Sequence, residues 1–159
     1  SIGSAVANIA RAFGMKVIAS TRTPKTAEGV TFMSTDEVFA KADFISLHCP
    51  LTDETRGLVN TEKLRLCKPT AYIINTSRGP VVNEHDLAKA LNDGIIAGAG
   101  LDVVEVEPMR ADNPLLGAKN CIITPHVAWA PVQTRKRLIS AAADNLRSFI
   151  NGAPKNKVN

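Results

Sequence analysis

Three polar side chains of this sequence could together act on a carbonyl group. Arg78, Glu107 and His126 each come shortly after a short apolar run, and these runs are 71–74, 97–101 and 122–124. A histidine titrates near neutral pH and can donate a proton, and a nearby carboxylate orients its ring and favours its charged form. An arginine binds a carboxylate through two parallel hydrogen bonds and polarises a carbonyl beside it. The three side chains therefore suit proton transfer to the carbonyl oxygen of a small keto acid.

The elements that must position these residues alternate between helix-like apolar spacing and short apolar runs, the pattern of a parallel sheet with connecting helices. We expect helices at 2–13, 34–41, 60–67, 83–94 and 132–150, and strands at 16–20, 44–49, 71–75, 97–103 and 120–124. Ser34 and Glu37 form a capping box, and Asn60 and Asn83 cap the next two helices. The predicted fold class is α/β, a Rossmann-type doubly wound parallel sheet, which binds ligands beyond the carboxyl ends of its strands.

The first residues match part of a dinucleotide-binding turn. Ser1-Ile2-Gly3 opens an alanine-rich helix and fits the last half of Gly-x-Gly-x-x-Gly, whose third glycine lets the helix pack closely on a strand. An ordinary helix start is an equally good interpretation of this half alone. Because no strand precedes the helix, we expect the sequence to be an N-terminally truncated fragment that lacks the first strand and the start of the fingerprint.

The residues after the run 16–20 bear on the choice between NAD and NADP. Thr21 stands where a carboxylate would bind the adenosine ribose of NAD, and Arg22 follows it. The Arg22 guanidinium could pair with a 2′-phosphate, which makes NADP a candidate cofactor beside NAD. A solvated surface charge is the alternative interpretation of Arg22.

The remaining histidines and the cysteines are interpreted as non-catalytic. His48 ends a strand without an acidic neighbour and is either structural or cofactor-lining, and His85 is a surface residue. Cys49, Cys67 and Cys121 have wide spacings that match neither a disulfide framework nor a zinc site, so we expect reduced thiols and no metal. Since adjacent strand residues point to opposite faces, His48 and Cys49 cannot act as base and nucleophile together.

Length and composition describe one globular domain or part of one. The chain has 159 residues, of which 45% are hydrophobic and 21% charged, so disorder of the whole chain is excluded. The net charge is +4, but the basic residues are scattered, which argues against nucleic acid as a partner. No apolar run approaches the roughly 20 residues that span a bilayer, so we expect no membrane partner and a cytoplasmic location.

Four segments closely resemble successive motifs of a known family, the D-isomer-specific 2-hydroxyacid dehydrogenases. They are Ile45–Thr52, Asn75–Glu84, Gly98–Pro108 and Thr124–Trp129, and the resemblance covers essentially the whole chain. The Pro-His-Val-Ala-Trp stretch is most similar to the glycerate dehydrogenase and hydroxypyruvate reductase branch. The implied reaction is hydride transfer between NAD(P)H and a small 2-keto acid, converting hydroxypyruvate or glyoxylate to D-glycerate or glycolate.

The resemblance also assigns roles to residues. The family's arginine, glutamate and histidine are its catalytic set, which carries over to Arg78, Glu107 and His126, and Asp102 of the Leu-Asp-Val motif contacts the nicotinamide. The implied cofactor-binding residues are Ser1, Ile2, Gly3, Thr21, Arg22, Cys49, Pro50, Thr76, Ser77, Arg78, Asp102 and His126.

The resemblance further implies that residues 1–159 are a fragment of an NAD(P)-binding domain. Residues 131–159 would return toward a substrate-binding domain absent from the sequence, and the full-length protein would be a homodimer. Without the central strand, two strands would lack partners, and we expect poor stability. A nucleotide-binding interaction module similar to dehydrogenase-like corepressors, or an inactive fragment of the dehydrogenase, is the alternative. A hydrolase is not indicated, because Gly-x-Ser-x-Gly and phosphate-loop motifs are absent.

Overall fold

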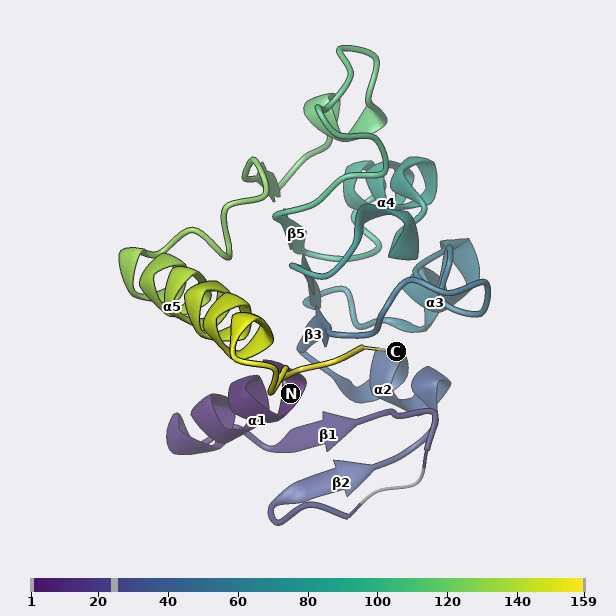
Figure 1. Ribbon diagram of the computed structural model, residues 1–159. Coiled ribbons are helices and arrows are strands. Elements are labelled where there is room, and N and C mark those ends of the chain that lie inside the picture. The colour runs from purple at the N-terminus through teal and green to yellow at the C-terminus, as the bar shows by residue number, and fades with distance from the viewer. Residues whose placement is uncertain (1, 24–25, 159) are drawn as a thin grey trace. The chain divides into compact units, whose positions relative to one another are not determined.

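The computed structural model describes residues 2–23 and 26–158 (Figure 1). The chain divides into two compact units, Ser1–Pro125 and His126–Asn159, each with its own internal contacts. Ser1, one of the expected cofactor-binding residues, lies outside the described residues.

The first unit is an α/β structure in which strands alternate with helices. Its elements, in chain order, are α1 (Ile2–Ala12), β1 (Val17–Ala19), β2 (Val30–Phe32), α2 (Thr35–Lys41), β3 (Phe44–Leu47), α3 (Thr61–Leu66), β4 (Tyr72–Asn75), η1 (Gly79–Val81), α4 (Glu84–Asn92), β5 (Gly98–Leu101), η2 (Pro114–Gly117) and β6 (Cys121–Ile123). Strands β3, β4, β5 and β6 form a sheet in that order, and β1 pairs with β2. Every pairing of these strands is parallel. The predicted α/β class with a Rossmann-type parallel sheet is therefore confirmed.

The sheet is in two pieces, since β1 pairs only with β2 and β3 only with β4 among the described strands, in line with the expectation that two strands lack partners. The strands differ from expectation in two ways. Strand β2 was not predicted, and it forms because Val30 and Phe32 line up with Val17 and Ala19 of β1. The other strands are also shorter than their apolar runs; β3, for example, ends at Leu47.

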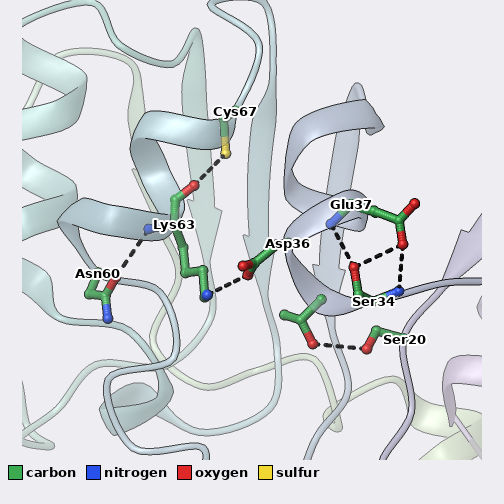
Figure 2. A network of polar contacts seen from close by, with 8 residues as sticks. Ser20, Ser34, Asp36, Glu37, Asn60, Lys63 and Cys67 are labelled. Carbon is green, nitrogen blue, oxygen red and sulfur yellow. Dashed lines mark hydrogen bonds and ion pairs between the residues drawn. The ribbon is translucent and has the colours of Figure 1, made fainter.

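Helix starts follow the predicted capping residues closely. The hydroxyl of Ser34 accepts the N–H of Glu37 at 3.2 Å, and the Glu37 carboxylate accepts the N–H of Ser34 at 3.1 Å, so the capping box of α2 is confirmed (Figure 2). Asn60 and Asn83 cap α3 and α4 through their side-chain oxygens. Each side chain satisfies a backbone N–H that has no partner inside its helix.

Helices α2 and α3 are joined by an ion pair between Lys63 of α3 and Asp36 of α2 (Figure 2). At the end of α3, the thiol of the buried Cys67 donates to the carbonyl of Lys63 at 3.5 Å. At the exit of β1, the hydroxyls of Ser20 and Thr35 lie 2.9 Å apart. An ion pair of this kind contributes only about 0–1 kcal/mol, so it adds little to the stability of the helix pair.

The core lies on one face of the four-stranded sheet. Alternate strand residues on this face are buried, namely Ile45, Leu47, Ile73, Ala99 and Leu101, and they form one cluster with Leu64 of α3 and with Leu87 and Leu91 of α4. Helices α3 and α4 lie side by side there (Figure 1). Burial of each such leucine or isoleucine contributes roughly 1.5–3 kcal/mol. The cluster holds the central strands β4 and β5 firmly, and so fixes where their carboxyl ends lie.

The second unit is built on one long helix, α5 (Val132–Ile150), whose bounds equal the predicted ones. Asn145 of this helix accepts a hydrogen bond from the amide of Asn156 at 2.8 Å, which folds the tail back on the helix. Among the described helices of both units, none is long and apolar enough to cross a bilayer.

Candidate active site

The loop after β4 is shaped by the buried side chain of Asn75. Its Oδ1 accepts the Ser77 N–H at 2.9 Å and the Ser77 hydroxyl at 2.8 Å, and its Nδ2 donates to the Arg78 carbonyl at 3.0 Å. Asn75 is 0% exposed, whereas Thr76 and Arg78 are exposed. The guanidinium of Arg78 also donates to the Ser77 carbonyl at 2.7 Å. The asparagine therefore holds a turn that presents Thr76 and Arg78 beyond the carboxyl end of β4.

Asp102 follows β5 directly and is buried. Its N–H donates to the Asn75 carbonyl at 2.8 Å, and its carboxylate accepts the Thr124 hydroxyl at 2.5 Å. These bonds connect the exits of β4, β5 and β6, because Asn75 ends β4 and Thr124 follows β6. Asp102 thus sits where the three strands end, as expected for a residue that lines the ligand edge of the sheet.

The loops that carry Arg78 and Glu107 touch through a glycine. A Cβ added to Gly79 would lie 1.9 Å from the Val104 carbonyl oxygen and 2.5 Å from the Glu105 nitrogen, far closer than real atoms approach. Glu107 is exposed, and its carboxylate accepts the Val104 N–H at 3.2 Å. The first unit therefore brings together the loop of Arg78 and the turn that holds Glu107.

Two residues that support these loops were not predicted to have a role. Asn75 and Glu84 are the first and last residues of the family motif Asn75–Glu84, and the sequence assigned no separate role to either. Both are buried, Asn75 at 0% and Glu84 at 7% exposure. A buried polar side chain must be hydrogen-bonded, and their partners lie in the site loops. The one sequence signal for them is a polar residue at the end of an apolar run or at a helix start.

The start of α1 lies against the segment that follows β3. A Cβ added to Gly3 would lie 3.3 Å from the Cβ of His48, so a larger residue there would crowd the histidine. Ile2 beside Gly3 is exposed. The His48 Nε2 lies 3.0 Å from the Ser46 hydroxyl, and burial lowers the pKa of His48. A small residue at this approach is what the third fingerprint glycine provides, so the residues present fit a dinucleotide-binding turn.

The cysteines show no sign of reactivity. Cys49, Cys67 and Cys121 are all free thiols, as predicted. Burial raises the pKa of all three, to about 11 for Cys67, which disfavours the nucleophilic thiolate. Pro50, beside Cys49, accepts the Thr55 hydroxyl through its carbonyl at 2.6 Å. Among the described residues, no group of three or more histidines, cysteines or carboxylates could hold a metal ion.

The guanidinium of Arg22 is exposed in the turn that follows β1. The hydroxyl of Thr21 donates to the Thr23 carbonyl at 2.7 Å, which closes a tight turn. Arg22 is exposed in this turn and forms no ion pair with another described residue. The turn therefore offers a positive charge at the end of the strand that follows α1.

His126 is the first residue of the second unit. It is partly buried and has a left-handed backbone, with φ of 54°, which is uncommon for a residue other than glycine. The first unit thus includes Arg78 and Glu107 but not the histidine, whose place beside them remains a prediction. His85 is exposed in the first turn of α4, as predicted for a surface residue.

Comparison with known proteins defines the family. Residues 1–128 match the family described as D-isomer specific 2-hydroxyacid dehydrogenase, NAD binding domain. The chain therefore belongs to the D-isomer specific 2-hydroxyacid dehydrogenases, which confirms the resemblance seen in its motifs. The part that it matches is the one that binds the dinucleotide.

Individual relatives agree with this assignment. The chain is 51% identical to a hydroxypyruvate reductase of Blautia hydrogenotrophica over 99% of its own length and 50% of that protein's. It is also similar to the crystal structure of the TT0316 protein from Thermus thermophilus, with a TM-score of 0.92 and 43% identity over 99% of this chain and 50% of that one. An acyclic imino acid reductase in complex with NADPH and D-Arg has a TM-score of 0.89 and 35% identity over 98% of this chain and 50% of that one. The chain spans about half the length of the curated relatives it matches.

Proposed function

We propose that this chain is the cofactor-binding part of an NAD(P)-dependent oxidoreductase that reduces a small 2-keto acid to a D-2-hydroxy acid. Membership of the dehydrogenase family supports the reaction class. The observation that carries the proposal is the contact of Gly79 with the Val104 backbone, because it joins the loop of Arg78 to the turn of Glu107 at the exits of β4 and β5. Hydroxypyruvate and glyoxylate are the proposed substrates, and the first is supported by the name of the Blautia relative.

The cofactor would lie along the carboxyl ends of the strands. Ser1, Ile2 and Gly3 would face its pyrophosphate, since the first turn of a helix presents unpaired N–H groups and a positive dipole end. The other cofactor-binding residues proposed are Thr21, Arg22, Cys49, Pro50, Thr76, Ser77, Arg78, Asp102 and His126. When bound, the nicotinamide supplies the hydride that reduces the substrate.

The chain's own catalytic groups have distinct tasks. Arg78 binds the substrate carboxylate through two parallel hydrogen bonds and polarises the neighbouring carbonyl. His126 holds a proton and gives it to the carbonyl oxygen as negative charge builds there. Glu107 orients the imidazole and stabilises its charged form. This division of roles requires Glu107 and His126 to be neighbours in the working enzyme.

Use of NADPH is supported by the exposed Arg22 in the turn after β1, where a 2′-phosphate could pair with its guanidinium. Replacement by alanine tests this: Arg22→Ala should raise the KM for NADPH at least about tenfold and leave the KM for NADH nearly unchanged, since one charge-assisted contact contributes about 1.5–3 kcal/mol. Equal changes in both constants would contradict the role of Arg22.

The organisation of the whole enzyme is also a proposal. Residues 1–159 would form the NAD(P)-binding domain, with residues 131–159 returning toward a substrate-binding domain, as the half-length match to relatives supports. A homodimer is supported by exposed apolar residues at helical spacing, namely Ile2, Val6 and Ile9 of α1 and Phe13 directly after the helix. Three free thiols favour a reducing compartment, the cytoplasm.

Turnover of the full-length natural polypeptide tests the proposed function. NADH or NADPH oxidation is followed with hydroxypyruvate and with glyoxylate for the wild type, for His126→Ala and for the control His85→Ala. The wild type and the control should turn over equally, whereas His126→Ala should lose about 10²-fold to 10⁴-fold of kcat, the range of a general acid. Unchanged turnover in His126→Ala would contradict the assignment of His126 as the proton donor.

A further inference from the structure

The carboxylate of Glu84 occupies an unusual place for a charged group. It is the first residue of α4 and is only 7% exposed. Charged side chains are rarely this buried unless they are paired or hydrogen-bonded. Its position at the N-terminus of α4 favours a negative charge, because the helix dipole is positive there. The negative charge of Glu84 also contributes, after burial, to raising the pKa of Cys121.

Both oxygens of this carboxylate bind one loop. Oε1 accepts the Glu105 N–H at 2.7 Å, and Oε2 accepts the side-chain amide of Asn113 at 2.7 Å. The Oδ1 of Asn113 in turn accepts the Leu115 N–H at 2.9 Å, which caps η2. Hydrogen bonds to a buried carboxylate are among the stronger ones in proteins. Glu84 therefore fixes residues 105 and 113, and Glu107 lies between them.

Glu84 is also close in the chain to the loop of Arg78. Only five residues separate the two, and they include Gly79, which packs on the Val104 carbonyl. The segment 78–84 thus contacts the segment 104–105 twice, once through the glycine and once through the carboxylate. A displacement of the Glu84 carboxylate would change where Glu107 stands relative to Arg78.

We propose that Glu84 is a positioning residue of the reaction, which holds the loop of residues 105–113 so that Glu107 stands beside the arginine loop. This inference rests on the proposed function, since only that function gives Glu107 a catalytic role. Glu84 acts through the loop backbone and through Asn113, not on the substrate.

The test variant is Glu84→Gln in the full-length natural polypeptide. Its amide oxygen can still accept the Glu105 N–H, but its NH₂ group then faces the NH₂ group of Asn113. The Asn113 amide cannot rotate by 180° to present its oxygen to residue 84 without losing its bond to the Leu115 N–H. We expect kcat with hydroxypyruvate to fall about 10-fold to 100-fold with little change in the KM for NAD(P)H, because an error of about 1 Å in a catalytic group has this effect.

Two further variants separate positioning from general stability. Asp86→Asn is the matched control, because Asp86 also lies in the first turn of α4 and accepts a backbone N–H, that of Thr61 at 2.9 Å, outside the site loops. It should leave kcat unchanged. Adding Asn113→Asp to Glu84→Gln restores the hydrogen bond with its polarity reversed, and should recover kcat.

The outcomes distinguish this inference from the proposed function. A wild-type polypeptide without 2-keto acid reductase activity would contradict the proposed function itself. An active wild type with Glu84→Gln within about twofold of it in kcat would overturn the positioning role alone. The role is also wrong if neither Glu84→Gln nor the double variant folds, because Glu84 would then serve the fold and not the site.

Discussion

A methyl group added at residue 79 should push the loop of Arg78 away from the turn of Glu107. The Cβ of Gly79→Ala would lie 1.9 Å from the carbonyl oxygen and 2.0 Å from the carbonyl carbon of Val104. Both atoms belong to the backbone, so no side-chain rotation relieves the overlap. Ordinary van der Waals contact begins at 3.4 Å, so the loop at Val104 must retreat by about 1.5 Å.

The expected effects follow from this displacement. Overpacking of a close contact typically costs about 1–3 kcal/mol of unfolding free energy. A shift of about 1 Å in a catalytic group can cost about 100-fold in rate. We therefore expect kcat/KM for hydroxypyruvate to fall at least about 100-fold in Gly79→Ala, while the protein still folds.

The assay compares full-length Gly79→Ala with wild type and with Gly117→Ala. An added Cβ at Gly117 meets no atom within 4 Å, so this variant controls for a glycine-to-alanine change in a short helix. Hydroxypyruvate turnover and thermal unfolding are measured for all three. A Gly79→Ala enzyme that keeps its activity within about threefold would refute the contact as the basis of the site.

Three further predictions concern the fold. Asn60→Ala should lower the unfolding free energy by about 1 kcal/mol in urea titration, because α3 loses its cap, and no loss would contradict that role. Burial lowers the pKa of His48 in the folded protein, so as the pH falls through the ordinary value of 6.5 the unfolded chain takes up a proton before the folded protein does. The free energy of unfolding should therefore drop more between pH 7 and pH 5 in wild type than in His48→Gln. Equal drops in the two proteins would refute this. Cys49, Cys67 and Cys121 should react slowly with a thiol reagent at pH 7.5 and all three rapidly in denaturant, whereas fast native labelling of Cys67 would contradict its burial.

The helices were predictable because their signals are local. The capping box of Ser34 and Glu37, the caps Asn60 and Asn83, and the apolar spacing of 132–150 all lie within a few residues of the feature they specify. Strand β2 was missed for the opposite reason. Its three residues form a strand only by pairing with β1, in which Val17 is the partner of Val30, thirteen residues later. No local pattern in the sequence predicts that pairing.

The positions of Arg78, Asp102 and Glu107 after the strands could be predicted, but the residues that support their loops could not. The rule that ligands lie beyond the carboxyl ends of parallel strands drew attention to these three residues, and their roles come from the family resemblance. Glu84 was overlooked because its partners lie 21 and 29 residues away and are supplied by the fold. Asn75 bonds to nearby Ser77 and Arg78, but its complete burial is set by the packing around it. A buried polar residue can be recognised as such only when the packing around it is known.

A crystal structure of the full-length natural polypeptide with NAD(P)⁺ and oxamate, an unreactive mimic of a 2-keto acid, would examine the proposed catalytic set most directly. We expect the carboxylate of Glu107 within hydrogen-bond distance of the His126 imidazole, about 2.7–3.2 Å, and the guanidinium of Arg78 paired with the oxamate carboxylate. Side chains of Arg78, Glu107 and His126 on different sides of the molecule would contradict the assignment of all three.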